Sequence, residues 1–141
     1  MQTSITLAFG DGEYLFALPI KQIVALEGKA GLIDEVRHRV LNGGFGILDI
    51  TETIRHAAIG GGKGMVNGVE FAVTELKANS LISTYVEGKP LAEVALTARA
   101  IIAALYVGYT PDDHPKKKAQ PRKSRSRSTG ASSSTTASPS G

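Results

Sequence analysis

A glycine-rich segment with one lysine, Gly60-Gly61-Gly62-Lys63-Gly64, is the first feature of this sequence that suggests chemistry, because such segments can bind phosphate. A phosphate-binding loop needs a glycine five residues before the Gly-Lys pair and Ser or Thr directly after the lysine. The chain has Ala57 and Gly64 at these positions. The segment also follows an expected helix, so its amides would not converge at a helix N-terminus. We interpret it as a flexible connector between helices.

The other reactive residue types do not form a recognisable site. His38 and His56 each lie beside arginine in an expected helix, and His114 lies near the C-terminus. Neighbouring positive charge disfavours metal binding and general-base catalysis, so we expect solvated helix faces for the first two. The absence of cysteine removes thiol nucleophiles and thiolate ligands, and no Gly-x-Ser-x-Gly elbow is present. We therefore predict a protein that is not an enzyme, with no catalytic residues, metal site or cofactor.

Acidic pairs and net charge fit a binding domain better than a nucleic-acid binder. Asp34-Glu35 and Asp49 with Glu52 fall at expected helix starts, where carboxylates cap and complement the helix dipole. Residues 1–109 hold nine Lys or Arg and eleven Asp or Glu, a net charge of −2. We therefore consider nucleic-acid binding by this part of the chain unlikely.

The basic character of the chain belongs to residues 110–141, which hold seven basic and two acidic residues. No apolar residue larger than alanine follows Tyr109, so burial cannot offset the entropy of ordering this segment. We predict a domain at 1–109 and a disordered basic Ser/Thr-rich tail at 110–141. The tail would contact polyanions weakly, or act only as a solubilising extension. Its candidate contacts are Lys116, Lys117, Lys118, Arg122, Lys123, Arg125 and Arg127.

Apolar periodicity predicts the elements of the domain. Alternation on both sides of Gly10-Asp11-Gly12 predicts an N-terminal β-hairpin. Three- and four-residue spacing then predicts helices beginning near Pro19, Ile33, Asp49, Val69 and Leu91. The fold class is therefore α+β, with the hairpin packed on a small bundle of four to five helices.

The helix expected from Val69 to Val86 has an apolar face that moves along its length. The helix either bends near Asn79-Ser80 or is buried on both sides, and the pattern leaves both interpretations open. The most apolar stretch, residues 94–107, is too short to span a membrane and contains Arg99. No signal peptide is apparent, so we expect a cytoplasmic protein with no membrane partner.

Three segments in order carry a resemblance to a known family: ITLAFGDGEYLFALP at 5–19, IVALEGKAG at 23–31 and DITETIRHAAIGGG at 49–62. They resemble the gene transfer agent and siphophage family of small tail proteins, described as tail assembly chaperones and in some places as tail tube proteins. The likeness covers roughly residues 4–109. Its motifs are architectural, and the family has no catalytic residues to carry over.

The resemblance implies a chaperone that coats the apolar, helical tape measure protein before tube subunits polymerise around it. Tube rings are built from β-sandwich subunits, whereas this sequence predicts one hairpin and mostly helices. A structural tube component retained in the particle remains the alternative, and a weak polyanion binder is a second one. We expect the tape measure and other tail proteins as partners, with self-association left open.

The last two expected helices carry more apolar surface than a small core needs, which suits a partner helix. We therefore predict partner contacts at Leu81, Ile82, Tyr85, Ile101, Ile102 and Leu105.

Overall fold

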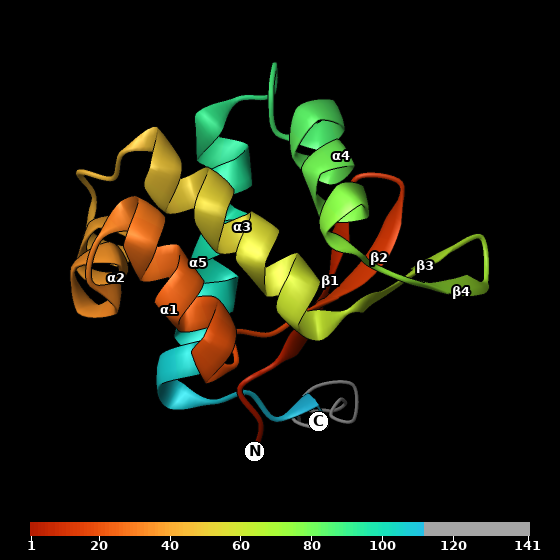
Figure 1. Cartoon of the computed structure of the whole chain (residues 1–141), viewed down its shortest axis with the longest axis horizontal. Coiled ribbons are helices and arrows are strands. Elements are labelled where there is room, and N and C mark those ends of the chain that lie inside the picture. Colours follow the sequence, from red (N-terminus) through yellow and green to blue (C-terminus); the bar gives the residue numbers. More distant parts are fainter. Residues whose placement is uncertain (112–141) are drawn as a thin grey trace, which may run out of the picture. The chain divides into compact units, whose positions relative to one another are not determined.

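The computed structural model describes residues 1–111, and the compact unit considered below spans Gln2–Tyr109. This unit confirms the α+β class, with an antiparallel sheet and five helices among the described residues (Figure 1). The strands are β1 (Ile5–Phe9), β2 (Gly12–Phe16), β3 (Lys63–Val66) and β4 (Val69–Ala72). The helices are α1 (Ile20–Ala30), α2 (Ile33–Asn42), α3 (Ile47–Gly61), α4 (Glu75–Tyr85) and α5 (Leu91–Val107).

The predicted N-terminal hairpin is confirmed. β1 and β2 pair antiparallel around the two-residue turn Gly10-Asp11, with Phe9 opposite Gly12. One face of the hairpin, which we call the inner face, is buried through Ile5, Phe9, Tyr14 and Phe16. The alternation of the sequence therefore marks the buried face correctly.

A second hairpin, β3–β4, corrects the helix expected from Val69. The strands flank Asn67-Gly68, with Val66 opposite Val69. Both turn residues have positive φ, 52° and 80°, as a type I′ turn requires. Strand β4 therefore occupies the first part of the expected helix, and α4 begins at Glu75 behind the Thr74 N-cap. The change of element at this point explains why the apolar face moves.

The glycine-rich segment is not the flexible connector that the sequence suggested. Gly60 and Gly61 end α3, Gly62 is its left-handed C-cap with φ 76°, and Gly64 lies in β3. A Cβ atom on Gly61 would overlap the carbonyl oxygen of Leu15 in β2. These glycines therefore let α3 approach the sheet backbone directly, and the amide of Ala17 donates to the carbonyl of Ala57 at 3.0 Å.

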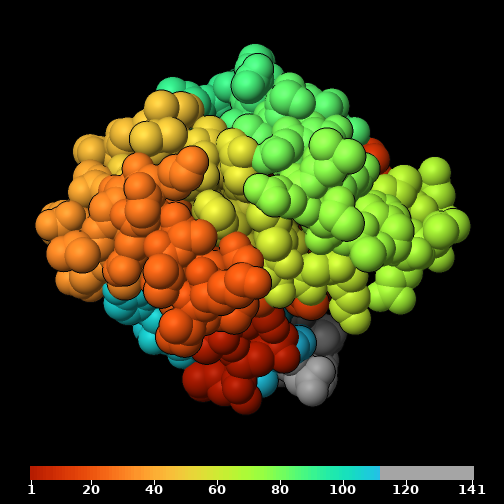
Figure 2. All heavy atoms as spheres, in the orientation of Figure 1, coloured from red at the N-terminus to blue at the C-terminus, as the bar shows by residue number. Residues whose placement is uncertain are grey.

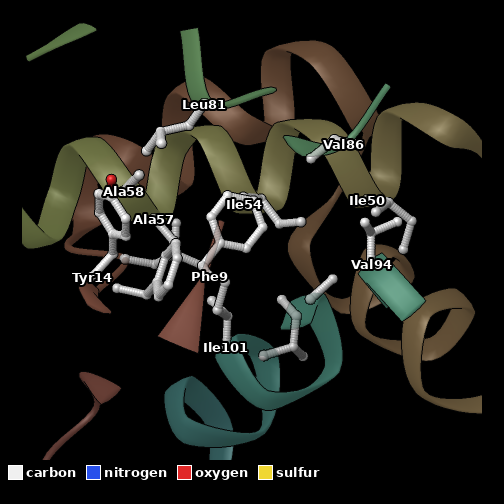
Figure 3. Close-up of a cluster of buried hydrophobic side chains, with 14 of the residues drawn as sticks. Phe9, Tyr14, Ile50, Ile54, Ala57, Ala58, Leu81, Val86, Val94 and Ile101 are labelled. Atoms are coloured by element: carbon white, nitrogen blue, oxygen red, sulfur yellow. The ribbon is translucent and has the colours of Figure 1, made fainter. Parts of the chain in front are cut away.

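Helix α3 lies at the centre of the core and contacts β2, α1, α4 and α5. Ile50, Ile54, Ala57 and Ala58 face the inside of the unit from this helix. Figure 3 shows them meeting side chains from β1, β2, α4 and α5. Phe9 packs edge-on against Tyr14, Phe16 and Tyr85 at centroid distances of 5.9–6.3 Å.

The predicted tail contacts, Lys116, Lys117, Lys118, Arg122, Lys123, Arg125 and Arg127, lie outside the described residues. Within residues 1–111, no helix has the length and apolar character needed to cross a membrane.

Candidate functional site

The residues predicted to contact a partner lie mostly inside the core. Leu81 and Ile82 of α4 are 2% and 5% exposed, and Ile101 and Ile102 of α5 are 2% and 0% exposed. Tyr85 and Leu105 are partly buried against the same core. These six side chains are therefore used by the fold, because they pack against α3 and the first hairpin (Figure 3). The accessible apolar surface of these helices lies at other residues, Leu76 of α4 and Leu91, Leu96, Tyr106 and Val107 of α5.

An apolar groove opens where the start of α3 meets the connection between α4 and α5. Its volume is about 420 Å³. Figure 2 shows these two segments, in gold and blue-green, at the upper edge of the face in view. Ile47, Leu48 and Leu91 are each about half exposed at this groove, at 52%, 48% and 49%. We call it the α3–α5 groove; its lining includes Ile47, Leu48, Thr51, Ile82, Val86 and Leu91.

An ion pair holds the start of α3 in place beside this groove. The guanidinium of Arg39 donates to both carboxylate oxygens of Asp49 at 2.8 Å and to the carbonyl of Ala30 at 2.8 Å. The Asp49 carboxylate also accepts from the amide of Gly46 at 2.7 Å. The hydrogen bonds from Arg39 lower the pKa of Asp49 despite its burial. One charged pair therefore fixes the ends of α1, α2 and α3 together, and Ile47 and Leu48 project from this fixed point.

The capping prediction for Asp49 and Glu52 is correct for the first and wrong for the second. Asp49 caps the helix from its third position, since α3 begins at Ile47. The Glu52 carboxylate instead lies 3.2 Å from Arg55 and 3.4 Å from His56, at the polar end of the groove. Asp34 and Glu35 do lie in the first turn of α2, as predicted.

His56 is not on a solvated helix face, which corrects the expectation for this residue. Its ring nitrogens lie 2.9 Å from the Gln22 amide oxygen and 3.4 Å from Glu52. Burial lowers the pKa of His56, and Glu52 opposes that shift. Glu52 precedes His56 by one helical turn, a spacing that the sequence contained and that our reading of it missed. His38, by contrast, is exposed as predicted.

The groove offers an apolar surface with a charged rim and no arrangement of metal ligands. Among residues 1–111, no three His, Asp or Glu side chains come close enough to hold a metal ion. Arg55, Glu87 and Lys89 place charges of both signs around its edge. Such a surface is suited to binding an apolar segment that also carries polar side chains.

Comparison with known proteins identifies a family for this chain. The model of a family described as phage tail tube protein, GTA-gp10, matches residues 2–108. No curated protein and no solved structure matches the chain.

Proposed function

The chain belongs to the phage tail tube protein, GTA-gp10 family, and we propose that within this family it acts as a tail assembly chaperone that binds the tape measure protein. This role is one of binding rather than catalysis, and it would be carried out in the host cytoplasm while tails are built. The coarser statement, that the chain is a member of a phage tail protein family, does not depend on this proposal.

The α3–α5 groove is the observation that carries the proposal. Three half-exposed aliphatic side chains, Ile47, Leu48 and Leu91, surround one hollow. Fully burying such a side chain is worth roughly 1.5–3 kcal/mol, so covering the exposed halves of three contributes about 3 kcal/mol. An amphipathic helix presents apolar residues at three- and four-residue spacing, which suits a groove lined from two helices.

Co-expression with the tape measure protein tests this proposal. The chain should raise the soluble yield of the tape measure, and Leu48→Glu should reduce that gain about tenfold, since a charge would enter the apolar contact. Leu76→Glu is the matched control, because Leu76 is 79% exposed on α4 and does not line the groove. An equal effect of the two variants, or no effect of the chain itself, would rule out the proposed site.

A structural tube component is the second candidate, and the description of the family favours it. The single sheet, accompanied by five helices among the described residues, supports the chaperone instead, because tube rings are built from β-sandwich subunits. Mass spectrometry of purified particles separates the two roles. A chaperone should be absent from particles, and a tube subunit should be abundant in them.

A weak polyanion contact through the basic tail is a third role and can act beside either of the others. Deleting residues 110–141 should then abolish salt-dependent binding to DNA. Unchanged binding by the shortened chain would dismiss this role.

A further inference from the structure

The sheet ends in two edge strands, β1 and β4, whose free backbone groups can be assigned from the register. Two-residue turns make Phe9–Gly12 and Val66–Val69 hydrogen-bonded pairs. Because this bonding alternates along an antiparallel strand, Thr6 and Ala8 of β1 direct their N–H and C=O groups away from β2. The same alternation directs those of two residues of β4, Glu70 and Ala72, away from β3.

These four residues are exposed, and their outward backbone groups have no partner in the described part of the chain. Natural edge strands are usually protected by charge, proline, a bulge or a covering segment. Strand β1, Ile-Thr-Leu-Ala-Phe, has no charge and no proline. Strand β4 has one charged residue, Glu70, which lies 3.5 Å from Lys63 of the neighbouring strand. Both edges are therefore able to accept another strand.

The surroundings of the two edges are complementary. The end of β1 borders a hollow of about 290 Å³, whose other side includes Tyr85, Lys89, Glu93 and Thr97. The β3–β4 hairpin extends away from the helices, and β4 packs mainly on β3 (Figure 1). A thin hairpin can enter the space beside β1. If β1 paired instead with β1 of another copy, the α4–α5 segments of the two copies would lie against each other.

We propose that copies of this chain associate head to tail, with β4 of one copy adding to β1 of the next. The strand order β1-β2-β3-β4 makes this junction antiparallel and continues the alternation of the sheet. One register pairs all the outward groups: Thr6 lies opposite Ala72, and Ala8 lies opposite Glu70. No two like charges meet in this register. The contact is heterologous, so it repeats into a ring or a filament, and it does not depend on tape measure binding.

Cysteine cross-linking tests both the contact and its direction, because the natural chain has no cysteine. A Thr6→Cys chain and an Ala72→Cys chain with different tags should form a mixed disulfide when purified and oxidised together, since opposite residues in a strand pair lie within disulfide reach. Glu13→Cys replaces Thr6→Cys in the control, because Glu13 is also exposed but its strand is already paired on both sides. Mixed disulfides no more frequent than in this control would overturn the proposal.

Two other cross-linking outcomes would also overturn it. Predominant Ala72→Cys homodimers would indicate that β4 pairs with itself. Cross-links from an edge cysteine to a co-expressed tail protein, without any between copies, would assign the edge to a different partner.

Sedimentation of the purified chain alone supplies a second measurement. Ala72→Pro removes one outward N–H and should weaken self-association at least about tenfold, whereas Ala72→Ser keeps that donor and should leave association unchanged. A natural chain that stays monomeric at all accessible concentrations would refute the proposal. Because no tape measure protein is present, this failure is distinct from failure of the chaperone role.

Discussion

Replacing Gly61 with alanine should destabilise the protein strongly, although the same change in most helices is favourable. Gly61 is the last residue of α3, and a Cβ atom there would overlap the backbone of Leu15 in β2. Backbone cannot move aside as a flexible side chain can. The helix end would have to withdraw from the sheet, which would strain the hydrogen bond from Ala17 to Ala57.

The magnitude follows from three contributions. Alanine in place of helical glycine contributes about 0.5–1 kcal/mol of stability. Overpacking costs about 1–3 kcal/mol and occasionally more. Loss of one backbone hydrogen bond costs about a further 0.5–1.5 kcal/mol. We expect a net loss near 2–3 kcal/mol, or a fall in Tm of roughly 8–24 °C for a domain of this size.

Gly28→Ala is the matched control for this prediction. Gly28 lies inside α1, and nothing lies within 4 Å of a Cβ atom placed there. This variant should therefore raise Tm by roughly 2–8 °C, from the same helix preference without the overlap. Thermal unfolding followed by circular dichroism measures both. If the two variants shift Tm in the same direction, the direct contact between α3 and β2 is refuted.

Three further predictions concern the ion pair, the buried histidine and the second turn. Asp49→Asn should lower the free energy of unfolding, measured with urea at pH 7, by about 2 kcal/mol, since it breaks a partly buried pair. Because the folded-state pKa of Asp49 is lowered, the stabilisation by Asp49 is present above the ordinary value of 3.8 and is lost as the pH falls through the folded-state pKa. A variant whose stability is as sensitive to acid as that of the natural chain would contradict this. Burial lowers the pKa of His56, so protonation opposes folding and stability should decrease as the pH falls through 6.5; His56→Gln should reduce this slope, and an unchanged slope measured by urea titration would count against it. Gly68→Ala places a side chain at φ 80° and should cost about 1 kcal/mol; amide hydrogen exchange in the β3–β4 hairpin should then be faster than in the natural chain while exchange in α3 stays the same, and an unchanged rate in the hairpin would contradict this.

The sequence predicted the first hairpin and the fold class because their signals are local. Strict alternation around Gly10-Asp11 has one structural solution. The second hairpin was missed because its strands have only four residues each. In Val69-Glu70-Phe71-Ala72 the apolar spacing also fits a helix, and the Asn67-Gly68 turn signal was the better guide.

The candidate site was harder to predict because a stripe of apolar residues does not show what covers it. Ile101 and Ile102 face α3 and the sheet side of the core, which only the three-dimensional packing reveals. The sequence did not indicate Ile47 and Leu48 as groove residues, because it predicts a helix that begins near Asp49 and leaves both residues in the preceding loop. Arg39 and Asp49 are ten residues apart, and no short spacing rule connects them.

The attachment of the β3–β4 hairpin has a consequence for how the molecule loses structure. Two residue pairs, Glu13 with Met65 and Tyr14 with Gly64, join this hairpin to the rest of the sheet. Segments with so few buried contacts open at a lower free energy than the whole protein. We therefore expect the hairpin to detach from β2 and pair with it again while the helical core stays folded. Strand β4 would then be able to move when it pairs with another copy of the chain.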